Sequence, residues 1–455
     1  MEVSESIRSD AASTGRGRGS VAVAFVVGLV ALAVFGWGLS DEPHFVDESA
    51  YFAQAGYADL LITNRDDPSW LDYAGFDLPP LPKYLVGLSL ALHGYDRPHP
   101  RAAWEWYRDT SRRFEPPGAL LAARRPVVVL GALGCVAIYA LGTISSGRIA
   151  GVLAALLLMI NPLYRLHARR AMSDVPAEAF LLIALALGAA AWVRFVGRRN
   201  MASALALSIA AGAAVGFSVL SKLNGVISGL TLMSWAALGV ILLSRESRAR
   251  GTAWATGTSF ALLFSMLCAG LVSFGIFVAL NPFLTAQPAK PYDPRLEEVA
   301  VKSFSERVAM VADHRVAAMR QGQKLFPDDA LPTIESKITA VAVQGFGRFG
   351  PFGPAHADSR IRFDALQDAG AWIWGPITIV GFIWAVVAGK LRRRCGEIPG
   401  TWLAALQFLV AAAAVTASIP LAWDRYYLSL QPSTCLLAAI LGVGLLELAR
   451  RGATR

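Results

Sequence analysis

The chain has 455 residues, of which 55% are hydrophobic and 16% are charged, with a formal net charge of +9 and a mean hydropathy of +0.47. These values exclude a disordered chain and an ordinary soluble domain, and they indicate a protein that crosses a membrane several times. The positive charge lies mainly in short loops between apolar runs, so it is a topology signal and does not indicate nucleic-acid binding.

Ten uncharged apolar runs follow one another along the chain. The first, at 21–39, is long enough to cross a bilayer and is followed by no small-residue cleavage site, so we expect an uncleaved anchor. Because helices satisfy their own backbone hydrogen bonds in lipid, we predict an all-α membrane protein with about ten spans. The remaining runs are 126–145, 149–164 (the shortest), 175–193, 202–220, 223–243, 252–280, 371–389, 401–423 and 426–446.

Basic residues predict the orientation of these spans. Three arginines precede the first run, and the alternate short loops and the C-terminal tail are also basic, as the positive-inside rule requires. We therefore expect both termini in the cytoplasm, two long exoplasmic loops, and, for a bacterial host, the plasma membrane. The expected parts are a tail at 1–20, a catalytic module at 21–280 with loop 40–125, a second loop at 281–370, and C-terminal helices and tail at 371–455.

The first long loop is rich in charged and aromatic residues, and the second has Pro- and Gly-rich pieces around a helical stretch. The apolar stretch 81–93 is too short to span, so we expect a helix lying along the membrane interface. In the second loop, 294–323 is typical of a helix. The four cysteines fall in spans or a cytoplasmic loop without metal-ligand spacing, which predicts neither disulfide nor metal. They are Cys135, Cys268, Cys395 and Cys435.

An acidic pair, Asp47-Glu48, follows the first span closely. At the boundary between water and lipid, carboxylates stay ionised and can reach a lipid headgroup, which suits chemistry on a lipid-linked substrate. The alternative is that the pair only begins a helix, since acidic side chains favour a helix N-terminus.

A second polar group lies before the run at 175–193. Arg170, Asp174 and Glu178 recur at four-residue spacing and can share one helix face. A capped helix with a surface ion pair would explain the carboxylates. It would not explain arginines on the side that the positive-inside rule depletes, whereas a negatively charged ligand would.

Cations also lie at the outer ends of later helices. Lys222 occupies a very short turn and can bind phosphate as a point charge, or can simply snorkel to the interface. Arg425 offers a fork of donors suited to phosphate, although Tyr426 beside it is also typical of an interfacial belt. Lys83 follows the Pro-rich turn at 79–82 and is expected at headgroup height.

In order and topology, these motifs resemble the polyprenyl-phosphate-sugar-dependent glycosyltransferases of the membrane C-type fold, with protein O-mannosyltransferases and lipid A aminoarabinose transferases as the most similar branches. Leu78 departs from the family, which often has His or Lys there, at a position associated with the donor phosphate. The matching elements are Asp47-Glu48 with Tyr51, Pro79-Pro80-Leu81 with Lys83, Arg124 or Arg125, Arg170 with Asp174, Lys222 with Gly225, and Arg425-Tyr426.

The resemblance implies transfer of a sugar from a polyprenyl monophosphate to an acceptor hydroxyl of a protein, glycan or lipid of the cell envelope. Asp47 would act as general base with inversion at the anomeric carbon. Glu48 and Asp174 are further candidate catalytic residues: Asp174 would position acceptor or sugar hydroxyls or hold Arg170, and Glu48 would do the same or orient the loop. No metal or other cofactor is expected. The cations would stabilise the leaving phosphate: Lys222, Arg425, Arg170 and Lys83. Acceptor or sugar positioning would fall to Tyr51, Glu178 and Tyr426.

Two other functions are consistent with the same sequence. A transporter or flippase of lipid-linked sugars is the nearest alternative, but transporters usually carry ionisable residues or helix breaks near the middle of the membrane, which these spans lack. A non-catalytic scaffold is the third. An Asp47→Asn variant separates a transferase, which would lose turnover, from a scaffold, which would not.

Overall fold

The computed structural model describes residues 2–100, 116–197, 200–250, 254–348 and 369–453. Its described residues form helices and one isolated β-bridge between Ala330 and Leu421. Nine helical segments of this part are long and apolar enough to cross a membrane. The all-α, multi-pass membrane architecture predicted from the sequence is therefore confirmed. The helices that make up most of these segments are α1 (Glu2–Gly36), α7 (Pro117–Ser146), α10 (Asp174–Val196), α11 (Met201–Ser221), α12 (Val226–Arg250), α13 (Trp254–Ala279), α17 (Ala369–Arg394), α18 (Thr401–Ser418) and α19 (Gln431–Ala453).

The tenth apolar run forms a shorter helix, α8 (Arg148–Ile160), which has 13 residues and is followed by α9 (Pro162–His167). At 1.5 Å per residue, α8 alone is about 20 Å long, less than the hydrocarbon core. Together the two helices still connect the ends of the bundle. Arg148 donates to Ser20 near the start of the first span, and His167 lies beside Asp424 at the opposite end.

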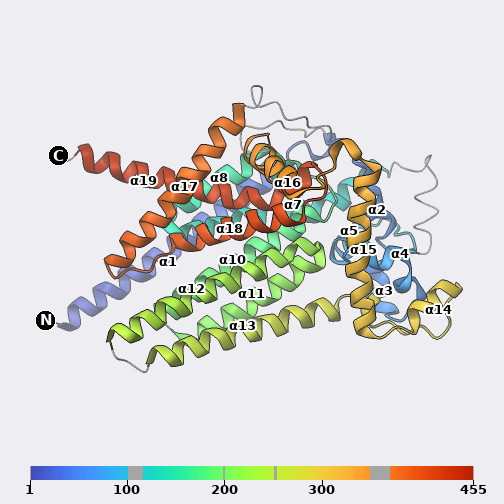
Figure 1. Cartoon of the computed structure of the whole chain (residues 1–455), viewed down its shortest axis with the longest axis horizontal. Coiled ribbons are helices and arrows are strands. Elements are labelled where there is room, and N and C mark those ends of the chain that lie inside the picture. Colours follow the sequence, from blue (N-terminus) through green and yellow to red (C-terminus); the bar gives the residue numbers. More distant parts are fainter. Residues whose placement is uncertain (1, 101–115, 198–199, 251–253, 349–368, 454–455) are drawn as a thin grey trace.

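Both termini lie at one end of the bundle, and the two long loops lie at the other (Figure 1). The first loop contributes α2 (Val46–Ala53), α3 (Tyr57–Thr63), α4 (Tyr73–Phe76) and α5 (Leu81–Leu92). The expected interfacial helix at 81–93 is therefore confirmed as a helix. The second loop contributes α14 (Pro294–Ala300), α15 (Phe304–Leu325), α16 (Ile334–Ala340) and a π-helical turn, η8 (Val341–Arg348).

Helix α15 crosses the loop-bearing end of the bundle beside α2–α5 (Figure 1). It begins with a capping box in which Ser303 and Glu306 satisfy each other's backbone amides. This cap breaks the predicted helical stretch at 294–323 into two helices. Through α15, the second long loop lies over the first loop at this end of the bundle (Figure 1).

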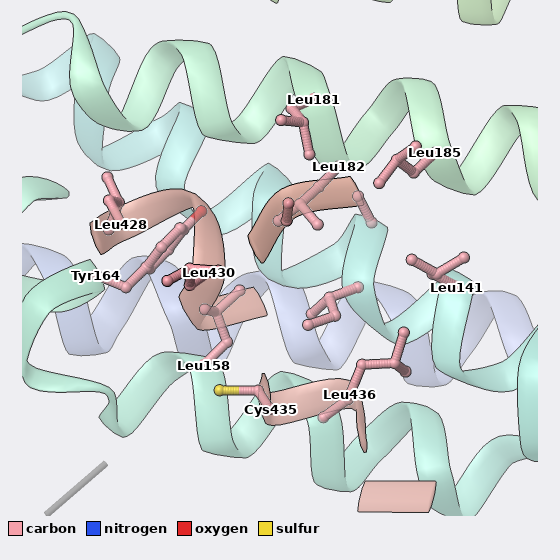
Figure 2. Packing of buried hydrophobic residues seen from close by; sticks show 14 of the residues in the cluster. Leu141, Leu158, Tyr164, Leu181, Leu182, Leu185, Leu428, Leu430, Cys435 and Leu436 are labelled. Carbon is pink, nitrogen blue, oxygen red and sulfur yellow. The ribbon is translucent and has the colours of Figure 1, made fainter. Parts of the chain in front are cut away.

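A packed core joins α7, α8, α10 and α19 beneath this end (Figure 2). Lipid tails are as apolar as leucine, so small residues that allow close contact matter more than apolar burial in holding such helices together. Gly142 and Gly151 show this: a β-carbon on Gly142 would lie 2.8 Å from the Cα atom of Gly151. Helices α7 and α8 therefore pack in close backbone contact. The core side chains labelled in Figure 2 include Leu141, Leu158, Tyr164, Leu181, Leu182, Leu185, Leu428, Leu430, Cys435 and Leu436.

Candidate active site

A cavity of about 510 Å³ lies at the loop-bearing end, between the first loop, the ends of the spans and α15. Its volume is in the range of small-molecule and cofactor sites. Segments from six separate parts of the chain line it, so no one motif makes the site. The charged and phenolic residues on its wall are Asp47, Tyr51, Asp77, Asp174, Lys222, Arg315, Arg425 and Tyr426.

Asp47 and Arg425 form an ion pair on the wall of this cavity. Asp47 is the second residue of α2, and the Arg425 guanidinium donates to its Oδ2 atom. Arg425 lies on the 3-10 helix η9 (Asp424–Leu430), with its guanidinium carbon 4.9 Å from the ring centre of Trp423 and 5.8 Å from that of Tyr426. These aromatic contacts orient the Arg425 guanidinium. The side chain of Asp47 is 36% exposed and stays accessible from the cavity.

Asp174 and Lys222 form the second ion pair, with 2.7 Å between Oδ1 and Nζ. Asp174 is the first residue of α10, and Lys222 lies between α11 and the short turn η5 (Leu223–Gly225). Gly225 allows this turn to pack on α11, since a β-carbon there would lie 2.4 Å from the carbonyl carbon of Ser218. The Lys-x-x-Gly spacing therefore fixes the lysine at the cavity wall.

Two tyrosines complete the wall. Tyr51 lies one turn after Asp47 on α2 and is 3% exposed. Burial raises the pKa of its phenol, and the nearby carboxylates Asp174 and Asp47 reinforce this effect. Ser173 and Arg425 oppose it. Tyr51 therefore stays a neutral hydrogen-bond donor. The Tyr426 ring centre lies 5.7 Å from the Lys222 Nζ atom.

Glu178 lies one helical turn below Asp174 in a narrow recess that continues from the cavity. Its Oε2 atom accepts a hydrogen bond of 3.0 Å from Ser429, and its Oε1 atom is buried with no hydrogen-bond partner. Asn224 also lines the recess. A buried carboxylate oxygen without a donor is costly, so this position favours a ligand hydroxyl or a water molecule.

Glu48 points away from the cavity into the protein. Its two oxygens accept a bidentate pair of bonds from Arg124, at 2.8 and 2.7 Å, and further bonds from the backbone amides of Phe45 and Ala171. The bond from Phe45 is the one that a capping-box glutamate makes at a helix start. These contacts favour the expected role of orienting the loop, and they identify Arg124, rather than Arg125, as the partner.

Two of the predicted phosphate ligands lie outside the cavity wall. Arg170 packs on the Phe45 ring and lies 3.8 Å from Glu42, so it joins the first loop to the start of α10. Lys83 is 1% exposed and donates to the carbonyl of Ala74 at 2.6 Å. Burial lowers the pKa of Lys83 to about 7, opposed by Asp77 and reinforced by Arg315.

The structure adds residues that the sequence motifs did not indicate. Arg315 on α15 and Asn224 on η5 line the cavity, and Asp77 closes it from the first loop. His167 is buried and lies 3.4 Å from the partly exposed Asp424, next to Arg425. No local pattern marks these residues, because each reaches the site through contacts between distant segments.

No group of three or more His, Cys, Asp or Glu side chains suited to a metal occurs in the described part of the chain. The expectation that no metal is needed stays a prediction. The four cysteines are free thiols, two of them buried and one exposed.

The described part of the chain is a multi-pass helical membrane bundle with a covered cavity at its loop-bearing end. The profile of the dolichyl-phosphate-mannose-protein mannosyltransferases matches residues 26–285, more than half of the chain, and the chain belongs to this family. No curated protein sequence is significantly similar to it.

Two archaeal structures with TM-scores above 0.5 support the fold. The oligosaccharyltransferase of Archaeoglobus fulgidus with zinc and sulfate aligns with a TM-score of 0.53 and 15% identity, over 94% of this chain and 50% of that one. The AglB structure from the same organism, with an inhibitory peptide and a dolichol-phosphate, aligns with a TM-score of 0.53 and 14% identity. The alignment covers 96% of this chain and 52% of that one. ArnT from Cupriavidus metallidurans in the apo state aligns with a TM-score of 0.49 and 16% identity. The alignment covers 94% of this chain and 60% of that one. The chain thus spans about half to three fifths of the length of these proteins.

Proposed function

We propose that this chain transfers a sugar from a polyprenyl-phosphate donor to an acceptor hydroxyl on a protein, glycan or lipid. One observation carries the proposal: a single cavity brings together a partly exposed carboxylate, Asp47, and three cations that can face a phosphate, Lys222, Arg315 and Arg425. Family membership and the archaeal folds support a lipid-linked donor.

In this reaction Asp47 takes the proton from the acceptor hydroxyl, while the oxygen of that hydroxyl attacks the anomeric carbon of the sugar. The bond from that carbon to the phosphate oxygen breaks, and the phosphate leaves with the electron pair. A single displacement inverts the anomeric carbon, by analogy with inverting glycosidases. A phosphate needs no proton to leave, so fixed cations can provide the assistance.

The two ion pairs suit this sequence of events. Arg425 pairs with Asp47 before the donor binds, and its remaining N–H groups can turn to the phosphate as negative charge develops there. Lys222 is similarly placed, held by Asp174. Glu178, Tyr51 and Tyr426 surround the space left for the sugar and the acceptor.

We place this chemistry on the exoplasmic side. Arg148 and Arg392 lie at the end of the bundle opposite the cavity, where they contact Ser20 and the Ser145 carbonyl. This is the end that the positive-inside rule assigns to the cytoplasm, and both termini lie there (Figure 1).

The test is sugar transfer from a panel of radiolabelled polyprenyl-phosphate sugars, mannose first, by purified protein in lipid nanodiscs with a crude acceptor extract. Wild type should release polyprenyl phosphate and label an acceptor, and Asp47→Asn should lose this activity. Asp313→Asn, an exposed carboxylate on α15, is the matched control and should remain active. Donor binding without transfer across the panel, or movement of intact donor across a bilayer, would replace the transferase with a carrier.

A further inference from the structure

His167 is the last residue of helix α9 and lies buried in the bundle, with 1% of its side chain exposed. Helix α9 packs on η9, the turn that carries Arg425, and its Tyr164 belongs to the packed core (Figure 2). Just before α9, the Asn161 amide donates to the Gln431 side chain at 2.9 Å, which ties this helix to the first residue of α19. His167 is therefore held in a fixed place beside η9.

Asp424, at the start of η9, links His167 to Arg425. Its Oδ2 atom lies 3.4 Å from the His167 Nε2 atom, and its Oδ1 atom accepts a hydrogen bond of 2.6 Å from the backbone amide of Arg425. One carboxylate therefore contacts the imidazole and also satisfies a backbone donor in the first turn of η9. A shift of this carboxylate would move the guanidinium that pairs with Asp47.

The ion pairs near the cavity show which charge His167 can supply. Asp47 and Asp174 are each paired with a permanent cation. Asp424 is not: among the residues that the structure describes, His167 is the one basic side chain within ion-pair distance of it. The pair of His167 and Asp424 is thus the third ion pair at this end of the bundle, and the one whose cation depends on pH.

The hydrogen bonding of His167 also favours the charged ring. Both ring nitrogens are buried without a hydrogen-bond partner. A neutral imidazole would leave one buried donor and one buried acceptor unsatisfied, which is costly. An imidazolium instead directs a charged N–H group at Asp424, and a neighbouring carboxylate favours the charged form of a histidine.

The other charged groups around His167 are few. Helix α9 packs against α8, α10 and η9. From α10, Asp174 is a second carboxylate within electrostatic reach of His167. From η9, the guanidinium of Arg425 has the same sign as the imidazolium, but it is already paired. The one charged residue of α8, Arg148, lies at the opposite end of the bundle, and Arg165 of α9 itself is exposed.

We propose that His167 is a positioning residue of the proposed transfer: its protonated ring holds Asp424 so that η9 presents Arg425 to the general base. The proposal rests on the proposed function, because Arg425 acts in that reaction. His167 does not line the cavity, so it acts through Asp424 and not on the substrate. Transfer then requires an ionised general base and a protonated His167, and activity should fall as the pH rises through the titration of His167.

The first experiment measures kcat and KM for sugar transfer by the purified full-length protein in lipid nanodiscs, from about pH 5 to about pH 9. Wild type should lose activity toward the alkaline end. His167→Gln should lower kcat by about 10-fold to 100-fold at the pH of maximal activity, leave KM near its wild-type value, and lack the alkaline fall. His93→Gln, at an exposed histidine that ends α5, is the matched control and should keep the wild-type profile. A lower profile that stays parallel to that of wild type would reduce His167 to a structural role and overturn the proposal.

Asp424→Asn tests the link between the two side chains. An asparagine oxygen can still accept from the Arg425 amide, but it has no charge to hold an imidazolium. This variant should therefore reproduce both the lower kcat and the missing alkaline fall. The double variant should be little worse than either single variant, because groups that act as a unit are not additive. Losses that multiply fully would overturn the proposal.

The charge of His167 can also be measured without turnover. The chain has six histidines, so NMR spectra of protein labelled only at the histidine ring nitrogens contain few signals, and the signal missing from His167→Gln is that of His167. In wild type this ring should stay doubly protonated to a higher pH than in Asp424→Asn. Identical titration of the ring in these two proteins would overturn the proposal, whatever the activity of the variants.

Failure of this proposal and failure of the proposed function give different results. An active wild type whose pH profile is unchanged in His167→Gln removes the positioning role and leaves the transferase. A wild type that transfers no sugar, but whose His167 ring still responds to Asp424 in the spectra, removes the transferase and the positioning role with it, and leaves only the buried ion pair.

Discussion

Arg425 donates a hydrogen bond to the carboxylate of Asp47, although the two residues are 378 positions apart in the chain. The pair joins the start of the first loop to the turn before the last helix, and it places a carboxylate and a guanidinium on one wall of the cavity. Both residues therefore depend on each other for orientation, and their effects on turnover should not be independent.

We expect Asp47→Asn to lower kcat by about 10²-fold to 10⁴-fold, the usual contribution of a positioned general base. Arg425→Gln should lower kcat by about 10²-fold to 10³-fold, as removal of one donor to a developing negative charge does. The double variant should be little worse than either single variant, because groups that act as a unit are not additive. The measurement is a double-mutant cycle on sugar transfer. Effects that multiply fully would show that the two residues act separately.

The buried pair of Glu48 and Arg124 is expected to govern stability. Glu48→Gln leaves a buried guanidinium without its charge partner, which typically costs about 3 to 5 kcal/mol. The apparent unfolding temperature in detergent should fall clearly. Arg125→Gln, at the adjacent and more exposed position, is the control and should change little. Matching unfolding temperatures for the two variants would contradict the structural role of Glu48.

Lys83 should make stability depend on pH. Burial lowers its pKa to about 7 in the folded protein, below the ordinary lysine value of 10.5. The unfolded chain therefore binds more protons than the folded one between these two values, so this contribution to stability rises as the pH is raised from about 7 to about 10.

Lys83→Met removes this linkage. Thermal unfolding between pH 6 and pH 10 should show the variant gaining most over wild type near or below pH 7, with the advantage shrinking at higher pH. Parallel profiles for the two proteins would show that Lys83 is not desolvated as the structure indicates.

Glu178 should affect the use of the donor more than the fold. The unpartnered Oε1 atom in the recess can accept a hydrogen bond from a sugar hydroxyl. Losing such a bond corresponds to about 10-fold to 100-fold in kcat/KM. Glu178→Gln, which keeps the size and the bond to Ser429, should lower kcat/KM within this range without changing the unfolding temperature. Unchanged kinetics would mean that the recess holds only water.

Local sequence signals were enough to predict the membrane architecture and the end of the bundle where chemistry is expected. Apolar runs and basic loops are local signals, because a helix in lipid must be long, apolar and internally hydrogen-bonded. Asp47, Tyr51, Asp174, Lys222, Arg425 and Tyr426 were all predicted from short motifs, and the structure brings them to one cavity.

Which charges face that cavity could be seen only from the packing of distant segments. Glu48 lies next to Asp47 in the chain, yet its side chain points inward and pairs with Arg124. Lys83 and Arg170 contact residues of the first loop and do not line the cavity. Arg315 lies in a helix with no motif and reaches the site because α15 crosses the end of the bundle (Figure 1). The physical reason is that the partner of a charge is set by packing between distant segments, whereas periodicity and spacing report only neighbours along the chain.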